Sequence, residues 1–119
     1  MKLAFIGTGK IIADALFAIE PIKEIEKTAI FARPHSKEKA EAFAKQYNIA
    51  EVYTDYEKLL TETTADTVYI GLINSAHYSY AKQALLHGKN VILEKPFTGF
   101  YNEAQELQQI AEENKLFIF

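Results

Sequence analysis

The sequence predicts an α/β fold, in which a doubly wound parallel sheet of about six strands carries helices on both faces. Short apolar segments alternate with helix-like segments throughout the 119 residues, which is typical of parallel strands joined by helical crossovers. The first apolar segment ends abruptly in Gly7-Thr8-Gly9, and a helix-like segment follows at once. Because such crossovers are right-handed, the alternation favours the strand order 3-2-1-4-5-6 in a single domain over residues 1–119.

The first half of the chain is expected to contain three strands, at residues 2–6, 28–32 and about 51–53. A first helix over residues 10–20 ends with help from Pro21. A second helix is indicated by four apolar side chains with helical spacing, namely Ala40, Phe43, Ala44 and Tyr47. Thr54 and Glu57 match a capping box for a short third helix that ends near Leu60.

The second half of the chain repeats this alternation, with strands expected at residues 67–70, 90–93 and 116–119. Ser75 is expected to cap a helix after the first of these strands, and Gly88 is expected to follow its C-cap. The last helix has a core face of Ala104, Leu107, Ile110 and Ala111. The chain stops at Phe119 inside an apolar strand, which suggests a domain taken from a longer protein.

The composition is that of an ordinary globular domain, with 49% hydrophobic and 24% charged residues. The formal net charge of -3 argues against a general role in binding nucleic acid or a membrane surface. The absence of cysteine excludes disulfides and thiolate chemistry and fits a reducing compartment. We expect a cytoplasmic protein, because the N-terminus lacks a cleavable signal pattern and no apolar run is long enough to cross a bilayer.

The glycine turn after the first strand is typical of the phosphate-binding corner of dinucleotide-binding (Rossmann) domains. Gly7 allows a tight turn that a Cβ atom would obstruct, and Gly9 lets the backbone approach a pyrophosphate closely. The next helix then points its unpaired N–H groups and its positive dipole end at the anion. Ile12 occupies the sixth position of the motif instead of a small residue, which implies a slightly displaced helix or a wider turn. The alternative is a merely structural turn.

The residues after the second strand indicate which nicotinamide coenzyme such a turn would serve. An acid at the end of the second strand, about 20 residues beyond the glycines, would bind the ribose 2′-hydroxyl of NAD. Here residues 32–37 contain no acid, and the first one after the strand is Glu38. Arg33, Ser36 and Lys37 are suited instead to the 2′-phosphate of NADP, and Arg33 is also suited to stack on the adenine. The sequence therefore favours NADP over NAD. The alternative is that these residues are solvated and cap a helix.

Glu94-Lys95-Pro96 directly follows the fifth expected strand. Since ligands of open parallel sheets bind beyond the carboxyl ends of the strands, Lys95 belongs to the same edge as Gly7 and Gly9. Its ammonium group is suited to donate a proton, or to stabilise charge on a substrate oxygen, during hydride transfer. Glu94 would orient this lysine, and Pro96 would stiffen the turn. The alternative is an ordinary surface pair of charges.

Asn74 and His77 follow the fourth expected strand, near the start of a helix. They would face the ribose or nicotinamide side of the coenzyme. The alternative for His77 is a local hydrogen bond in the first helical turn. His35 and His87 are expected at the surface, and no spacing of His, Cys and carboxylate residues indicates a metal site.

These segments together resemble the N-terminal domain of the Gfo/Idh/MocA oxidoreductase family, which includes glucose–fructose oxidoreductase and inositol dehydrogenase. The run VYIGLINSAHYSYAKQALLHGKNVILEKPFT, residues 68–98, is very similar to the central signature of that family, and residues 5–11 agree with its opening. The resemblance covers essentially the whole chain, and the Glu-Lys-Pro element is its most distinctive part. The chain departs from the family in Ile12, where a small residue is usual, and in Ile73, where a proline is common.

The resemblance implies a nicotinamide dinucleotide, NADP or NAD, as the coenzyme. With the patterns above, it predicts a pyrophosphate-binding turn of Gly7, Thr8, Gly9, Lys10 and Ile11. The other predicted coenzyme-binding residues are Arg33, Ser36 and Lys37 at the adenosine end, Asn74 and His77 beside the coenzyme, and Glu94 and Lys95 near the nicotinamide. Lys95 is also the implied catalytic residue. The family's second domain, absent from this chain, is expected to supply further catalytic groups and a dimer surface.

We therefore expect the coenzyme-binding domain of an NAD(P)-dependent oxidoreductase, which transfers a hydride to or from a small sugar, polyol or related hydroxy or carbonyl substrate. The isolated chain would bind coenzyme without turning substrate over. Apolar area exposed by the missing domain would let it self-associate as a homo-oligomer. Two alternatives stay open: a non-catalytic NAD(P)-binding regulatory module, and an enzyme with another nucleotide-like ligand, such as a methyltransferase.

Overall fold

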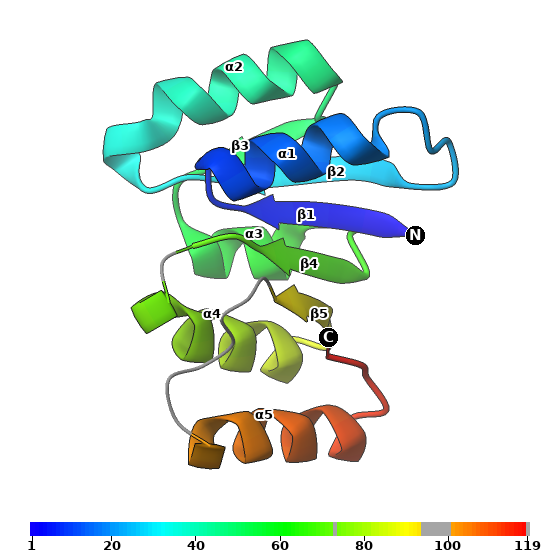
Figure 1. The fold of residues 1–119 in the computed structure, drawn as a ribbon, viewed down its shortest axis with the longest axis vertical. Coiled ribbons are helices and arrows are strands. Elements are labelled where there is room, and N and C mark those ends of the chain that lie inside the picture. The colour runs from blue at the N-terminus through cyan, green and yellow to red at the C-terminus, as the bar shows by residue number, and fades with distance from the viewer. Residues whose placement is uncertain (73, 94–100, 119) are drawn as a thin grey trace.

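The computed structural model describes residues 1–72, 74–93 and 101–118, apart from the side chains of residues 74–76 and 101. In these residues, five parallel strands form one sheet (Figure 1). Along the sheet the strands follow the order β3-β2-β1-β4-β5. Their bounds are β1 Lys2–Ile6, β2 Glu26–Phe31, β3 Glu51–Tyr53, β4 Thr67–Ile70 and β5 Asn90–Leu93. Every neighbouring pair is parallel, so the predicted fold class is confirmed.

Of the sixth strand expected at residues 116–119, the described residues up to Ile118 show a single parallel bridge, between Val91 and Ile118. The N–H of Val91 donates to the carbonyl of Phe117 at 3.0 Å, and the N–H of Phe117 donates to Oδ1 of Asn90 at 3.0 Å. This segment thus lies beside β5, where the predicted strand order puts it. A side chain takes up one of its backbone donors, and this interrupts the ladder that a full strand would form.

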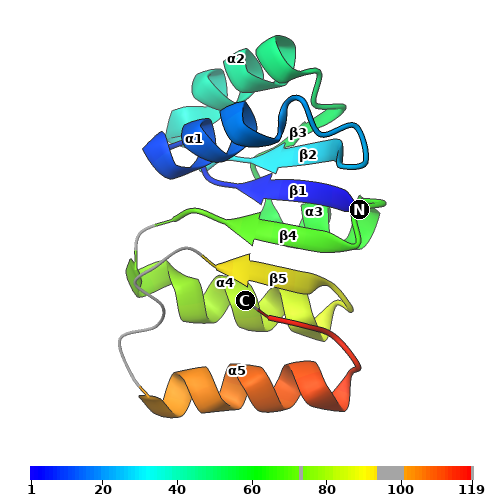
Figure 2. The same ribbon diagram turned by 45° about the vertical axis from the view of Figure 1, so that its right-hand side comes forward.

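Helices cover both faces of the sheet in two groups (Figures 1 and 2). Helices α1 (Lys10–Ile19) and α2 (Lys37–Tyr47) pack on one face, beside β1, β2 and β3. Helices α3 (Tyr56–Glu62), α4 (Asn74–Leu86) and α5 (Tyr101–Glu113) lie on the other face. Of the helices in the described residues, none combines the length and the apolar character that crossing a membrane requires.

Successive side chains of each strand supply two separate cores, one on each face of the sheet. In β1, Leu3 and Phe5 belong to the core under α1 and α2, whereas Ala4 and Ile6 belong to the core under α3, α4 and α5. All four side chains are buried, because a parallel sheet is covered on both sides. Burial on both faces also explains why β1 is a continuous apolar run from Leu3 to Ile6.

Helix α4 differs from the prediction at its start and agrees with it at its end. The helix begins one residue before Ser75, so this serine lies within the first turn and is not the cap. At the other end, the N–H of Gly88 donates to the carbonyl of Leu85 at 3.0 Å, and the N–H of Lys89 donates to that of Ala84 at 3.0 Å. This pair of bonds is the Schellman motif, which confirms the predicted role of Gly88.

Helix α3 starts one residue later than the predicted capping box requires. Asp55, and not Thr54, is the N-cap residue, and its Oδ1 accepts the N–H of Lys58 at 3.1 Å. The helix continues to Glu62, beyond the predicted end near Leu60. Thr and Asp are both good N-caps, but the carboxylate also interacts favourably with the helix dipole.

Candidate functional site

The carboxyl ends of the parallel strands meet at one edge of the sheet (Figure 1). The glycine turn follows β1, Arg33 lies shortly after β2, and Gly71 directly follows β4. Ligands of open parallel sheets bind at this edge. Most of the predicted site residues therefore belong to one region of the molecule.

Gly7 forms the tight turn that the sequence predicts. Its φ of 121° lies in a region that L side chains rarely adopt, and its N–H donates to the carbonyl of Phe31 at 2.9 Å. A Cβ atom at this position would lie 2.9 Å from the carbonyl oxygen of Gly71 and 3.3 Å from Cδ2 of Leu72. Both the backbone conformation and the available space therefore require glycine.

Helix α1 starts next to this turn, with Gly9 as its N-cap residue and no side-chain cap. The first helical bond runs from the N–H of Ala13 to the carbonyl of Gly9, at 3.0 Å. In the described part of the chain, the N–H groups of Lys10, Ile11 and Ile12 meet no acceptor, and the first turn holds no acid. Among the described residues, a Cβ atom at Gly9 would have no neighbour within 4 Å, so these residues leave the space beside the donors open. The residues present therefore fit an anionic group such as a diphosphate.

The other residues of the predicted phosphate-binding turn are partly or largely exposed. Thr8 is half-buried, and Ile11 is an exposed apolar side chain. The Nζ of Lys10 lies 3.2 Å from Oδ2 of Asp14, and both of these side chains are mostly exposed. Exposed ion pairs of this kind stabilise little, so the ammonium group is able to leave Asp14 for a ligand.

Arg33, Ser36 and Lys37 lie close together where the 3₁₀ turn Pro34–Ser36 leads into α2. Arg33 and Lys37 are exposed and Ser36 is half-buried. Ser36 is the N-cap residue of α2, yet its hydroxyl makes no capping hydrogen bond. Among the residues described, these three side chains have no hydrogen bond or ion pair. A guanidinium, a hydroxyl and an ammonium group are therefore all available to a ligand.

His77 is buried in the first turns of α4, with 1% of its surface exposed. Its Nε2 lies 2.8 Å from the carbonyl oxygen of Leu72, and because a carbonyl only accepts, Nε2 carries the proton and donates it. Nδ1 is also buried and has no partner within the described residues. His77 therefore makes the local hydrogen bond that the sequence left as an alternative, and its contact with a coenzyme stays a prediction.

Several predicted site residues lie outside the description. Glu94, Lys95 and Pro96 are outside the described residues, as is Ile73, and only the backbone of Asn74 is described. The last described residue before Lys95 and its neighbours is Leu93, the final residue of β5. The catalytic role of Lys95 thus stays a prediction from the sequence.

Two buried tyrosines near α3 have raised pKa values. Burial, followed by the charges of Glu51 and Glu62, raises the pKa of Tyr53 to about 12. Burial also raises the pKa of Tyr56, whose hydroxyl donates to the carbonyl of Tyr80 at 2.8 Å. Both phenols therefore stay neutral at physiological pH and serve to pack α3 and α4 against the sheet.

A polar cluster of Tyr78, Lys82 and Glu106 joins α4 to α5. The hydroxyl of Tyr78 donates to Oε1 of Glu106, and the Nζ of Lys82 lies 3.0 Å from Oε2 of the same carboxylate. The hydrogen bond from Tyr78, and then that from Lys82, lowers the pKa of Glu106. This cluster is a contact between helices. No group of His, Cys, Asp and Glu residues suited to a metal ion occurs in the part of the chain that the structure describes.

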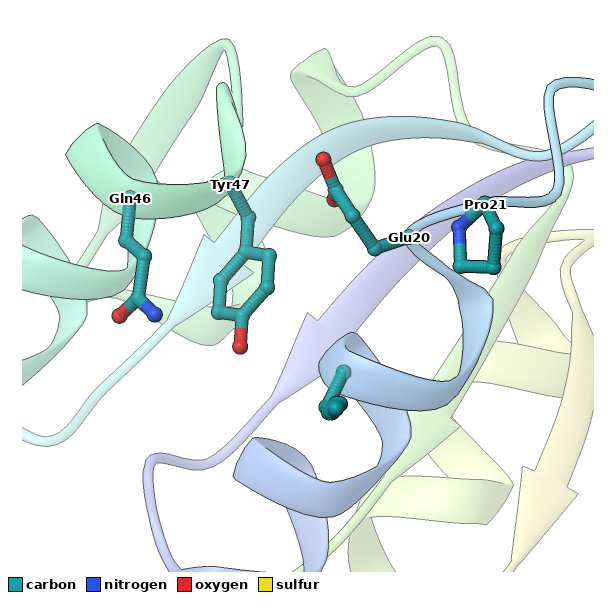
Figure 3. Close-up of a pocket in the computed structure, with 5 residues that line it drawn as sticks. Glu20, Pro21, Gln46 and Tyr47 are labelled. Carbon is teal, nitrogen blue, oxygen red and sulfur yellow. The ribbon is translucent and has the colours of Figure 1, made fainter.

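A surface hollow of about 510 Å³ lies between the ends of α1 and α2 (Figure 3). It is lined by Phe17, Glu20, Pro21, Gln46 and Tyr47. Since α1 has 10 residues, its two ends are roughly 15 Å apart. The hollow is therefore separate from the glycine turn, which lies at the start of α1.

The sequence analysis missed Gly71, which lies against the glycine turn. Its N–H donates to the carbonyl of Ile6 at 2.9 Å, and its own carbonyl oxygen occupies the space that a side chain at Gly7 would need. The signal in the sequence was a glycine directly after the apolar run of β4. The structure thus adds a third glycine to the two that the sequence predicts at this corner.

Comparison with known proteins identifies the class of this domain. Residues 1–119 match the model of a family described as an oxidoreductase family with an NAD-binding Rossmann fold. The chain is 31% identical over 118 residues to trans-1,2-dihydrobenzene-1,2-diol dehydrogenase of Xenopus laevis, a match that covers 99% of this chain and 35% of that protein. It is 32% identical over 114 residues to scyllo-inositol 2-dehydrogenase (NADP(+)) of Bacillus subtilis, with 96% of this chain and 34% of that protein covered.

A solved structure agrees with these matches. A 3-ketoreductase from Actinomadura kijaniata, in complex with TDP-benzene and NADP, superposes with a TM-score of 0.91 at 31% identity, over 99% of this chain and 37% of that chain. The present chain thus spans about a third of the length of these relatives. The matches confirm the Rossmann fold predicted from the glycine turn and the strand order.

Proposed function

Because this chain belongs to the Gfo/Idh/MocA oxidoreductase family, we propose that it binds NADP or NAD for an enzyme that oxidises an alcohol or reduces a carbonyl group. The family assignment rests on the match over all 119 residues and on relatives 31% and 32% identical to the chain. The activity of the whole protein belongs to the proposal, since the chain covers about a third of those relatives.

The observation that carries this proposal is the open start of α1. Gly9 contributes no side chain, the N–H groups of Lys10 and Ile11 have no acceptor in the described part of the chain, and the first turn holds no acid. A diphosphate supplies both the missing acceptors and the negative charge. A merely structural turn gives no reason for this arrangement, because Ser, Thr or Asp at the N-cap position would satisfy one of the donors.

We assign the 2′-phosphate of NADP to Arg33, Ser36 and Lys37. Support comes from their side chains at the start of α2, which have no partner among the described residues, and from the lack of an acid between the end of β2 and Glu38. A charge-assisted hydrogen bond contributes about 1.5–3 kcal/mol, so one good contact favours NADP by roughly tenfold to a hundredfold. The name of the Bacillus subtilis relative, which specifies NADP(+), points the same way.

The chemistry needs one proton in addition to the hydride. A bound nicotinamide supplies or accepts the hydride. The Nζ of Lys95 takes the proton from the substrate hydroxyl during oxidation and returns it to the carbonyl oxygen during reduction. Glu94 orients this lysine. His77 keeps the segment after β4 in position through its hydrogen bond to the carbonyl of Leu72, with Asn74 at the start of the same helix.

We propose a polyol, a sugar or a related small molecule as the substrate. Support comes from the names of the relatives, which are dehydrogenases of an inositol and of a dihydrodiol. Both of these compounds carry the hydroxyl-bearing carbon that hydride transfer requires.

Titration of the full-length protein with NADPH and with NADH tests the proposal. Nicotinamide fluorescence and calorimetry measure the binding. We expect saturable binding, with NADPH bound more tightly than NADH by roughly tenfold or more. Absence of heat with both coenzymes rules the proposal out and leaves the structural turn. A protein that binds coenzyme but turns over no member of a polyol and sugar panel is the non-catalytic module instead.

Replacement of Lys95 by alanine tests the catalytic assignment. We expect turnover to fall by roughly 10²–10⁴, because the proton transfer is lost, while coenzyme affinity stays nearly unchanged. Lys89→Ala is the matched control, because the Nζ of Lys89 donates to the carbonyl of Ala65 at 2.7 Å, beside the amino end of β4. Unchanged turnover in the Lys95 variant removes this residue from the mechanism.

A further inference from the structure

The packing around Ile12 differs from what the glycine motif leads one to expect. A small residue at this position normally lets the first helix lie close to the sheet. Here the isoleucine is fully buried in the core under α1 and α2. Room for its side chain has to come from a neighbouring element.

Gly71 provides that room. A Cβ atom at Gly71 would lie 2.7 Å from Cδ1 and 2.8 Å from Cγ1 of Ile12, and 3.3 Å from Cγ2 of Ile11. Carbon atoms in ordinary contact are about 3.5–4.0 Å apart, so no side chain fits at this position while Ile12 keeps its place. The small residue that the motif usually carries on the helix thus occurs here at the end of β4.

Close approach, and not backbone conformation, is the reason for glycine at position 71. The backbone φ of Gly71 lies outside the left-handed region, in contrast to that of Gly7. Alanine could therefore adopt the backbone of Gly71 without strain and would clash only through its methyl group. The clash would fall on the first turn of α1.

Gly71 also lies against the tight turn at Gly7. Its carbonyl oxygen lies 2.9 Å from where a Cβ atom of Gly7 would be. Gly71 thus lies against both the tight turn at Gly7 and the first turn of α1, and its carbonyl accepts no hydrogen bond from the N–H groups of that turn.

We propose that Gly71, acting through Ile12, is a positioning residue that sets where the first turn of α1 meets the diphosphate of the coenzyme. The pair replaces the small helical residue of the usual motif: a large side chain on the helix fits against a glycine directly after β4. This inference rests on the proposed function, because it concerns how tightly the same corner binds coenzyme.

The test is a set of four proteins: the full-length wild type, Gly71→Ala, Ile12→Ala and the double variant. Affinity for NADPH and NADH is measured by fluorescence titration, and the melting temperature is measured without coenzyme. We expect Gly71→Ala to lower the affinity by roughly tenfold or more, because the added methyl group displaces the start of α1. We expect the double variant to recover most of that loss, because the methyl group then enters space that the isoleucine has left.

Leu16→Ala is the matched control for the helix. Leu16 is also fully buried in α1 and belongs to the same core, but it is not among the close neighbours of Gly71. Combined with Gly71→Ala, it is expected to add its own effect and to restore nothing. If Gly71→Ala alone does not fold, the double variant provides the test. The inference then requires that the double variant fold and bind coenzyme.

The outcomes separate this inference from the proposed function. The inference is overturned if the loss of coenzyme affinity in the double variant equals the two losses of the single variants multiplied together. Recovery of the melting temperature without recovery of affinity also overturns it, because Gly71 is then a packing residue only. A wild-type protein that binds neither coenzyme overturns the proposed function itself. Coenzyme binding by the wild type is therefore measured before any substitution is made.

Discussion

Helices α1 and α3 start at the same edge of the sheet, but their first turns are satisfied in opposite ways. In α3, the carboxylate of Asp55 accepts the N–H of Lys58 at 3.1 Å, and Glu57 adds negative charge in the first turn. In α1, Gly9 offers no side-chain acceptor and the first turn has no acid. The first turn of α3 thus has a side-chain acceptor of its own. The first turn of α1 has donors that meet no acceptor among the described residues, and these residues leave open the space at the positive end of its dipole.

This difference shows that the parallel fold alone does not make an anion site. The fold brings both helix starts to the carboxyl edge, because each helix follows a strand. The residue at the N-cap position then decides whether the protein closes the helix start or leaves it for a ligand. Asp, Asn, Ser and Thr are the usual choices for a helix that has no such ligand.

The largest effect should come from giving α1 the cap of α3. Gly9→Asp puts a carboxylate in the open space of the corner, where it accepts a free N–H and repels the diphosphate. We expect coenzyme affinity to fall at least about a hundredfold, a loss of roughly 3 kcal/mol. The melting temperature should stay level or rise, since Asp is a better N-cap than Gly by a few tenths of a kcal/mol. Calorimetry with NADPH and thermal melting measure the two effects.

Gly9→Ala is the control for size. Its Cβ atom would meet no described residue within 4 Å, and the φ of −80° suits any residue. We expect this variant to fold normally and to bind coenzyme more weakly than the wild type but better than Gly9→Asp does. Equal affinity in all three proteins would mean that the diphosphate does not bind at the start of α1.

The second prediction compares the two glycines of the turn. Gly7→Ala forces a side chain into a φ of 121° and puts its Cβ atom 2.9 Å from the carbonyl oxygen of Gly71. Backbone strain of this kind costs about 1–3 kcal/mol, so we expect a clear loss in the free energy of unfolding. Urea unfolding of this variant beside Gly9→Ala measures the contrast. Similar stability of the two variants would contradict the separate roles that the structure indicates for Gly7 and Gly9.

Local patterns explain why so much of the fold was predictable. The strands β1, β3, β4 and β5 have the predicted bounds, because each is a short run of strand-forming residues set apart from the neighbouring helices. The cap of α3 was predicted one residue too early, because Thr54 and Asp55 are both good N-caps. The choice between them depends on the backbone angles that the folded chain adopts at Asp55, a φ of −117° and a ψ of 112°.

Contacts between distant parts of the sequence explain what was missed. Gly7 and Gly9 were predicted because a strand, a glycine turn and a helix follow one another directly. The role of Gly71 depends on Ile12, which lies far away in the sequence and next to it in the fold. The burial of His77 and its bond to Leu72 likewise depend on how α4 packs against the sheet. No local pattern contains that information.

The third prediction uses the start of α2, where Ser36 is the N-cap residue but makes no capping bond. Arg33→Ala removes the guanidinium that we assign to the 2′-phosphate. Affinity for NADPH should fall by roughly tenfold to a hundredfold, while affinity for NADH stays nearly the same. Lys39→Ala is the control, because it removes the same charge from an exposed position of α2. Equal losses of affinity for NADPH and NADH would contradict the assignment of Arg33 to the 2′-phosphate.

The smallest effect should come from opening the start of α3. Asp55→Ala removes the acceptor of the Lys58 N–H, and we expect the free energy of unfolding to drop by about 0.5–2 kcal/mol, the usual range for a lost N-cap. Coenzyme affinity should not change, because this start is closed in the native protein. Asp55→Asn keeps a capping oxygen and should lose less, which separates the hydrogen bond from the charge. A loss of coenzyme affinity in the folded alanine variant would show that the two helix starts are coupled. The contrast between a ligand-binding start in α1 and a structural start in α3 would then be wrong.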